Sequence, residues 1–320
     1  MRAEFSRPDI PALRSEGLTP VDMHFHTNCS DSDTDPVEAL RLAERMGVGL
    51  AITDHNLVQS VMRLKDMDPK VPVVPGMEVS TTDGPHVLVY FPTSRSLERF
   101  WYSRIRPRIQ ENPWLALRDC TTERLLDMCE EEDCVVSAAH PSGYFNTNKG
   151  VEICIRKGIV DPTVVSRLDA YEVISGGMTR ESNETSLRAA EGYGIGFTGG
   201  TDSHILEGLG GVVTVCGSST VEGILEDIRR HEVDVVGLEK NVREKVLTES
   251  TSAMRFARHV PSTVTVKARG IVRRRYHCCL SLSSASPSRA SSACLSSLFW
   301  RRFLRYMARM ASAATATMTA

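Results

Sequence analysis

The 320-residue sequence lacks several features that mark common classes of protein. No apolar run approaches the roughly 18 residues that a bilayer-spanning helix needs, so we expect no transmembrane segment. The N-terminal residues hold no apolar signal-peptide core, so we do not expect secretion. The nine cysteines are an odd number without Cys-x-x-Cys spacing. We interpret them as reduced thiols, which indicates a cytoplasmic protein.

Acidic residues are missing from the last part of the chain. No Asp or Glu follows Glu249, whereas residues 251–320 hold 12 Lys and Arg. The first 250 residues hold 26 Lys and Arg against 40 Asp and Glu, a formal charge of −14. An acidic body argues against a protein built mainly to bind nucleic acid, so we expect no stable nucleic-acid complex. It suits a protein that lines a pocket with carboxylates for cations.

This change in composition divides the chain into three predicted parts. Residues 1–17 are a polar lead-in, and residues 18–245 are long enough for one folded domain. Residues 246–320 are predicted to be a basic tail rich in Ser, Ala and Arg, without fixed structure over most of its length. Within the tail, Ser297 to Met310 could form a cationic amphipathic helix that rests on an anionic membrane or a partner. The alternative is a tail without function.

Apolar runs alternate with helical patterns between residues 18 and 245. Buried strands are expected at about 21–26, 48–55, 71–79, 86–90, 134–140, 169–175, 195–198 and 233–236. Helices are expected at about 35–46, 57–66, 122–132 and 220–230. Strands that alternate with helices predict parallel βαβ units and therefore an α/β fold.

A segment near the start of this domain carries side chains that bind metals. His24 and His26 are two residues apart in a predicted strand, so both lie on one face, and Asp31 follows in a loop. Imidazole nitrogens and carboxylates are ligands for Zn, Mn and Fe. Alone, the His-x-His pair could equally be an accidental pair on a polar strand.

Further histidines and carboxylates stand near the ends of the later strands, where a β/α barrel builds its active site. Singly, each has a structural explanation: Glu78 as a strand-end charge, His86 as a core histidine, Asp202 as a turn cap. Together they are too many for one ion and indicate a cluster of two or three divalent metals that Glu78 could bridge. The candidate ligands are His24, His26, Asp31, His55, Glu78, His86, His140, Asp202 and His204.

The order of these residues resembles the PHP (polymerase and histidinol phosphatase) family of metal-dependent phosphoesterases. The resemblance extends from about residue 18 to residue 240, and it departs at Ser32, where the family usually has glycine. The matching segments are His24-Phe-His-Thr-Asn-Cys-Ser-Asp31, Thr53-Asp-His55, Gly76-Met-Glu78, Gly84-Pro-His86, Ala139-His-Pro141 and Gly200-Thr-Asp-Ser-His204.

The resemblance implies a distorted seven-stranded (β/α)7 barrel with up to three divalent ions. It implies that Glu78 bridges two ions and that the remaining candidates complete the other sites. A hydroxide held between two ions roughly 3.5–4 Å apart could attack a phosphoryl group in line. Asp31 or His204 could then protonate the leaving alkoxide. The first ion would be bound by His24, His26, Glu78 and Asp202.

A cation that binds the substrate phosphate is expected on a neighbouring loop. The candidates are Lys149, Arg156 and Arg180. Arg180 is preferred because Ser175-Gly-Gly177 leaves room for a substrate beside it, although each could instead be a surface cation. Tyr144 and Phe145 could stack on a base or pack their loop.

These features predict an enzyme that hydrolyses a small phosphate ester, either a monoester or a diester, and a nucleotide is one possible substrate. One alternative is an amidohydrolase-type C–N hydrolase, although we find no lysine at a strand end suited to bridging metals after carbamylation. The other is a non-catalytic metal-binding module associated with nucleic-acid enzymes.

Overall fold

Ten strands form one mixed sheet in the part of the chain that this computed structural model describes, which is residues 1–143, 147–257, 259–260 and 263. Their order across the sheet is β1-β10-β9-β2-β3-β4-β5-β6-β7-β8. The strands are β1 (Ala3–Glu4), β2 (Thr19–Phe25), β3 (Gly49–Ile52), β4 (Val73–Ser80), β5 (His86–Tyr90), β6 (Val135–Ala138), β7 (Ala170–Ser175), β8 (Gly196–Gly200), β9 (Val212–Cys216) and β10 (Asp234–Gly237).

The sheet curls so that the β8 edge returns to β2. Phe25 forms a parallel bridge with Ser203, and the Asp202 amide donates to the His24 carbonyl at 2.7 Å. The prediction of an α/β fold with a barrel-like sheet is therefore confirmed. The predicted count of seven strands is wrong, because β9, β10 and β1 extend the sheet beyond β2. The sheet is also not all parallel, since β5 runs antiparallel to β4 and β6, and β9 to β2 and β10.

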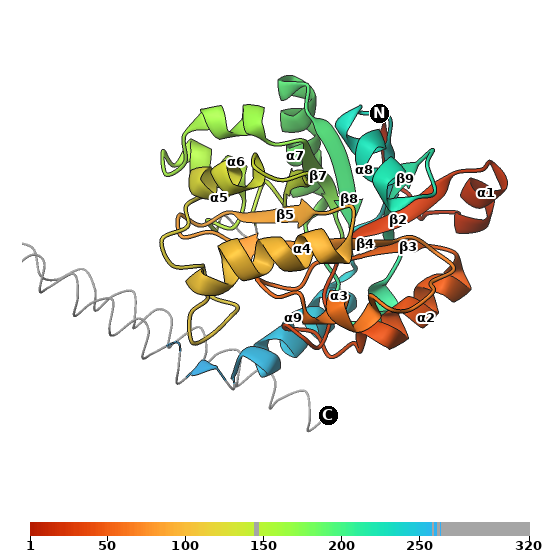
Figure 1. The fold of residues 1–320 in the computed structure, drawn as a ribbon. Coiled ribbons are helices and arrows are strands. Elements are labelled where there is room, and N and C mark those ends of the chain that lie inside the picture. The colour runs from red at the N-terminus through yellow and green to blue at the C-terminus, as the bar shows by residue number, and fades with distance from the viewer. Residues whose placement is uncertain (144–146, 258, 261–262, 264–320) are drawn as a thin grey trace, which may run out of the picture. The chain divides into compact units, whose positions relative to one another are not determined.

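Helices are arranged around the outside of the curled sheet (Figure 1). They are α1 (Ile10–Ser15), α2 (Pro36–Met46), α3 (Gln59–Leu64), α4 (Ser94–Phe100), α5 (Thr122–Cys129), α6 (Val151–Arg156), α7 (Arg180–Tyr193), α8 (Val221–Arg229) and α9 (Val242–Ala257). Shorter π and 3-10 turns span Trp101–Ile105, Arg106–Arg108, Pro162–Arg167 and Leu206–Gly208. None of the described helices combines the length and the apolar character that crossing a membrane requires.

α2 shows how local sequence sets an element. The Asp35 side chain accepts a hydrogen bond from the Val37 amide, and Pro36 occupies the first helical position. Gly47 ends the helix in the left-handed conformation, at φ 74°. Leu40 is buried against the sheet with its neighbours on the same face, so the helix is held by its apolar side.

Glycine allows β8 to approach β2 closely. A Cβ at Gly200 would lie 2.4 Å from the backbone nitrogen of His24, so any side chain would push the two strands apart. This contact brings the end of β8 beside the His-x-His segment at the end of β2.

Segments outside the predicted domain take part in the fold. β1, from the predicted lead-in, pairs in parallel with β10, and Arg2 bonds Asp234 at 3.0 Å. α9 runs across the predicted boundary at residue 245. The rest of the predicted tail from residue 264 onward, including the amphipathic helix at Ser297 to Met310, lies outside the described residues. The division into three parts stays a prediction.

Candidate metal centre

The nine candidate ligands meet at one end of the sheet. His24 and His26 come from the end of β2, Asp31 lies in the loop after it, and Glu78 lies near the end of β4. The others follow β3, β6 and β8 or begin β5. His86 is the first residue of β5, but β5 is antiparallel to its neighbours, so its start lies beside their ends. Eight of the nine are buried, and His55 is 13% exposed through its side chain.

Glu78 stands at the centre of the cluster. Its Oε1 atom lies 2.7 Å from His86 Nδ1 and 3.1 Å from His140 Nε2. Its Oε2 atom lies 2.9 Å from His55 Nδ1 and 3.3 Å from His26 Nε2. Oε2 is buried and makes no hydrogen bond within the described residues, although ring nitrogens surround it. A carboxylate oxygen in this position is suited to bridge two cations.

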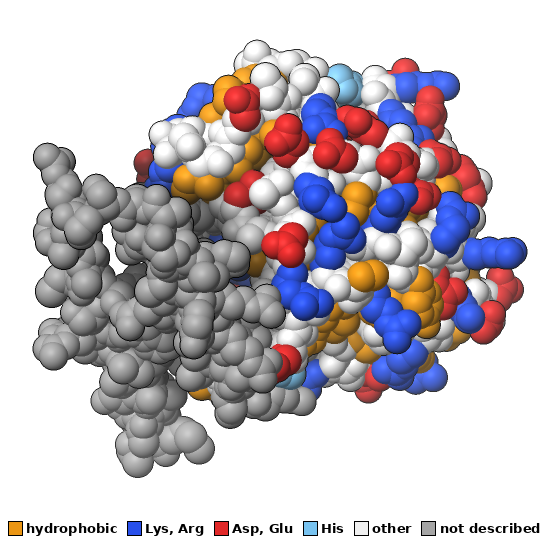
Figure 2. All heavy atoms as spheres, turned by 60° about the vertical axis from the view of Figure 1, so that its left-hand side comes forward, with side chains coloured by type: hydrophobic (Ala, Val, Ile, Leu, Met, Phe, Trp, Pro, Cys, Tyr) orange, Lys and Arg blue, Asp and Glu red, His pale blue; other side chains and the backbone are white. Residues whose placement is uncertain are grey.

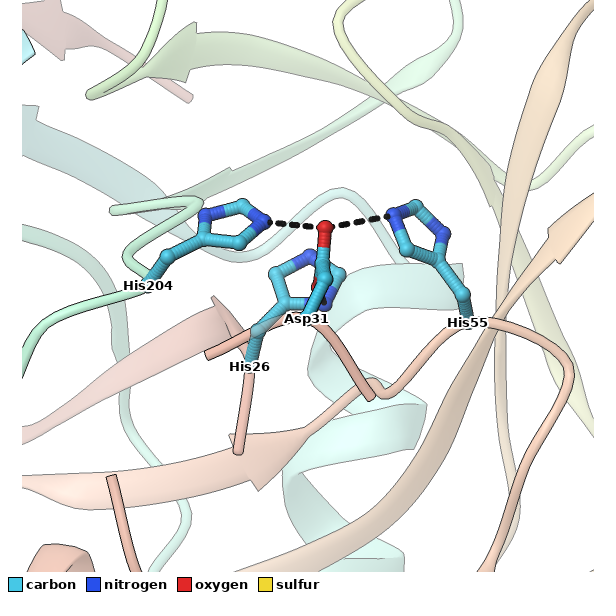
Figure 3. A group of neighbouring side chains, drawn as sticks. All are labelled: His26, Asp31, His55 and His204. Carbon is cyan, nitrogen blue, oxygen red and sulfur yellow. Dashed lines mark hydrogen bonds and ion pairs between the residues drawn. The ribbon is translucent and has the colours of Figure 1, made fainter. Parts of the chain in front are cut away.

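Asp31 forms a second centre, which Figure 3 shows between His204 and His55. Its Oδ2 atom lies 2.9 Å from His204 Nε2 and 3.5 Å from His55 Nε2, and its Oδ1 atom lies 3.5 Å from His26 Nδ1. These four residues each offer a ligand atom, and the four atoms lie within 4.8 Å of one another. One ion could be held by this group.

Two further groups of ligand atoms adjoin the first. One contains His24, His26 and Glu78, and the other contains His55, Glu78 and His86. The groups share His26, His55 and Glu78, so neighbouring ions would share ligands. Asp202 adds an oxygen 3.3 Å from His26 Nε2.

The buried charges shift one another's pKa values. Burial opposes ionisation of His26, but hydrogen bonds with Asp202 and Glu78 raise the pKa of its ring to about 9. Burial likewise opposes ionisation of His55, but Glu78 and Asp31 raise its pKa to about 10. Burial would raise the pKa of Glu78, but the surrounding imidazoles hold it well below its usual value. The carboxylates therefore attract positive charge, which divalent cations can supply in place of ring protons, and the donor set fits Mn, Fe or Zn.

Lys149 is the predicted substrate-binding cation that reaches the cluster. Its Nζ atom lies 2.7 Å from His86 Nε2. Burial and the charge of Lys149 lower the pKa of His86 to about 3, so the neutral ring accepts a hydrogen bond from the ammonium.

The other two predicted cations lie elsewhere. Arg180 begins α7, where its Nε atom lies 3.1 Å from Glu239 Oε2 and its guanidinium stacks 4.4 Å from the Phe5 ring centroid. Arg156 is exposed in the last turn of α6. Neither contacts a candidate ligand within the described ranges. Tyr144 and Phe145 lie outside those ranges.

Glu172 in β7 is a supporting residue that the sequence did not reveal. Its Oε1 atom lies 2.9 Å from His24 Nδ1, and its Oε2 atom accepts the His140 amide at 2.7 Å. Because Glu172 accepts a hydrogen bond from Nδ1 of His24, the Nε2 atom of His24 is left to face the cluster. The sequence feature that could have revealed it is a single acidic residue within the mostly apolar strand 170–175.

Asp54 supports the loop that carries Asp31. It accepts hydrogen bonds from the Thr27 amide at 2.8 Å and the Ser30 hydroxyl at 2.6 Å. Ser32, the departure from the usual glycine, donates its hydroxyl to the His204 carbonyl at 2.8 Å. The serine therefore ties the Asp31 loop to the loop that carries His204.

Two ligands sit in strained backbone conformations. His140 has φ 30° and Asp202 has φ 46°, in the left-handed region that non-glycine residues seldom adopt. Such residues cost of the order of 1–3 kcal/mol each, so the surrounding structure must hold them. The buried Lys240 ammonium donates to the Asp202 carbonyl at 2.7 Å and supports this turn.

Comparisons with known proteins give one family match and several structural matches. A PHP-associated family matches residues 180–233, and a comparison with the curated proteins gives no match. PsfC from Pseudomonas syringae is 17% identical, with 75% of this chain and 98% of that chain covered and a TM-score of 0.51. An endonuclease Q, in complex with a 27-mer duplex that has an abasic lesion at the active site, is 16% identical. That match covers 69% of this chain and 60% of that chain, with a TM-score of 0.54.

A third structure is a two-domain protein from Bacteroides vulgatus that contains a predicted PHP-like metal-dependent phosphoesterase. It is 14% identical, with 74% of this chain and 69% of that chain covered and a TM-score of 0.46. The first two structures establish a shared fold. The family match spans the segment that carries Asp202 and His204, two of the candidate ligands. The match of residues 180–233 to a PHP-associated family agrees with the resemblance that the sequence motifs indicated.

Proposed function

We propose that this chain hydrolyses phosphate esters with two to three divalent metal ions held by the histidine–carboxylate cluster. The observation that carries the proposal is Glu78, a buried carboxylate with imidazoles on both oxygens and no hydrogen bond to Oε2 within the described residues. Bound ions of this kind lower the pKa of water and offset the charge that develops on a phosphoryl group. We assign the candidate ligands to the ions, with Mn, Fe or Zn as the metal, and either Asp31 or His204 is left free of metal to act as the acid.

The residues of the chain position the reaction. Glu172 orients His24, and Asp54 and Ser32 hold the Asp31 loop against its neighbours. Asp31 and His204, 2.9 Å apart, form the pair that we assign to protonating the leaving alkoxide. Lys149 is the cation best placed to bind the substrate phosphate, because its ammonium already contacts His86.

The substrate class that we propose is a small phosphate ester, with a nucleotide as one example. A second candidate is hydrolysis of a phosphodiester in nucleic acid, which the shared fold with an endonuclease Q bound to a DNA duplex favours. The expectation of no stable nucleic-acid complex is therefore not confirmed. On the face shown in Figure 2, basic side chains lie among acidic ones rather than in a single basic patch.

A cytoplasmic location remains part of the proposal. Its support is that the described cysteines, at positions 29, 120, 129, 134, 154 and 216, are free thiols.

Hydrolysis of p-nitrophenyl phosphate and of bis(p-nitrophenyl) phosphate tests the proposal. We expect Mn²⁺-loaded protein to turn over one or both esters, and the preferred ester separates a monoesterase from a diesterase. Chelator treatment should abolish turnover and Mn²⁺ should restore it. His24→Ala should lose metal and activity together, because its Nε2 atom faces both Glu78 and Asp202. Full activity in chelated protein or in His24→Ala would exclude a metal-dependent reaction at this site.

A further inference from the structure

α9 packs with its polar side toward the protein. Thr248 and Thr251 are buried, and they belong to a row on one face of the helix together with Lys245, Ser252 and Arg255. Four apolar side chains of the helix are largely exposed: Val242 is 80%, Val246 61%, Leu247 46% and Met254 66% exposed. Phe256 is only partly exposed, and its ring centroid lies 6.2 Å from that of Trp114. Apart from Phe256, the side of α9 that faces the protein is therefore polar.

The polar face of α9 contacts loops at the mouth of the metal cluster. The Ser252 hydroxyl donates to Asp31 Oδ2 at 2.9 Å, and the Lys245 ammonium donates to the Met178 carbonyl at 2.8 Å. Farther along, Trp114 packs on His259 with ring centroids 4.6 Å apart. The contacts of α9, and of His259 just beyond its end, thus run from the loop after β7, past a candidate metal ligand, to Trp114.

Two polar atoms on this face are buried without a hydrogen-bond partner in the described part of the chain, Thr248 Oγ1 and Arg255 Nε. Arg255 is held beside the Asp31 loop, since its Nη2 atom donates to the Asn28 carbonyl and its Nη1 atom lies 3.6 Å from Asp33 Oδ1. Its side chain is only 19% exposed. A buried donor without a partner costs free energy that a ligand oxygen would recover.

An anion is the ligand that this face fits. Arg255 and Ser252 are one helical turn apart and therefore neighbours, and Ser252 already reaches Asp31. The Nε–H group of Arg255 and the Thr248 hydroxyl remain as donors for phosphoryl oxygens, and the charge of the guanidinium strengthens such a contact.

We propose that α9 forms one wall of the substrate site and that Arg255 binds the substrate phosphoryl group, with the hydroxyls of Ser252 and Thr248 beside it. This inference rests on the proposed phosphoesterase function and names a residue of its substrate site. It assigns a substrate-binding role to a helix that composition alone grouped with the tail.

Binding of inorganic phosphate to the Mn²⁺-loaded full-length chain tests the proposal without requiring turnover. Isothermal titration should show a Kd for phosphate at least tenfold higher in Arg255→Gln, because a charge-assisted contact is lost. Arg255→Lys should recover part of the affinity, since it keeps the charge but not the planar fork. The matched control is Arg243→Gln, on an exposed position of the same helix, which should change Kd less than twofold.

A structural role alone would give a different result. If Arg255→Gln lowered the thermal midpoint but bound phosphate as the wild type does, the proposal would be wrong. Thr248→Val keeps the shape of the side chain and removes only the hydroxyl, so it is the variant to use if Arg255→Gln does not fold. It should weaken phosphate binding about threefold. A Thr248→Val chain that binds phosphate with wild-type affinity would contradict the proposal. Wild-type protein that binds phosphate but hydrolyses no ester would overturn the enzymatic function, while the comparison of Kd values would still decide the role of Arg255.

Discussion

α8 and α9 are neighbours in the chain, but different interactions hold them in place: apolar burial for α8 and mainly hydrogen bonds for α9. α8 buries Ile224, Leu225 and Ile228 against the sheet, as an amphipathic helix of an α/β protein does. α9 buries threonines and exposes its valines, and its contacts go to the loops around the metal cluster. The difference indicates that α8 contributes chiefly to stability and that α9 contributes chiefly to the site.

The largest effect that we expect is the loss of stability when a buried side chain of α8 is shortened. Ile224→Ala should lower the free energy of unfolding by about 2–5 kcal/mol, because it removes a fully buried side chain from the interface of α8 with the sheet. Urea unfolding followed by tryptophan fluorescence measures the change.

The matched control for Ile224→Ala lies on α9. Val246→Ala should change the free energy of unfolding by no more than about 0.5 kcal/mol, since Val246 is 61% exposed. If both substitutions cost the same, apolar burial holds α9 as well and the comparison fails.

A smaller effect is expected from Glu172, the buried residue that supports His24. Glu172→Gln should weaken Mn²⁺ binding by roughly 10–100-fold, because the amide cannot accept from both His24 and the His140 amide. Competition with a metal-binding dye measures the affinity. An unchanged affinity together with a large loss of stability would make Glu172 a purely structural residue.

The sequence predicted those parts of the molecule that depend on local pattern. The cap and apolar face of α2 follow from Asp35-Pro36 and the spacing of its buried residues, and the candidate ligands follow from motif order. β9 was not predicted. It runs antiparallel both to β2, which is distant in sequence, and to β10, the next strand, whereas the βαβ pattern predicts parallel neighbours.

Roles that depend on distant contacts could not be predicted from the chain. Glu172 supports His24 only because the curled sheet brings β7 beside β2, across 148 residues of sequence. Ser252 and Arg255 were grouped with a basic tail, because composition shows the loss of acids after Glu249 but not the contact of α9 with Asp31. Arg180 was preferred from its neighbouring glycines, whereas the structure pairs it with Glu239.

The metal content of the purified chain tests the central claim most directly. After reconstitution with Mn²⁺ and desalting, mass spectrometry of the metal should give two to three ions per chain in the wild type. Glu78→Gln should lose at least one of them, because Glu78 faces imidazoles on both oxygens and joins the neighbouring groups of ligands. A wild-type chain that retains no ion, or a Glu78→Gln chain that retains the full number, would contradict a metal centre bridged by Glu78.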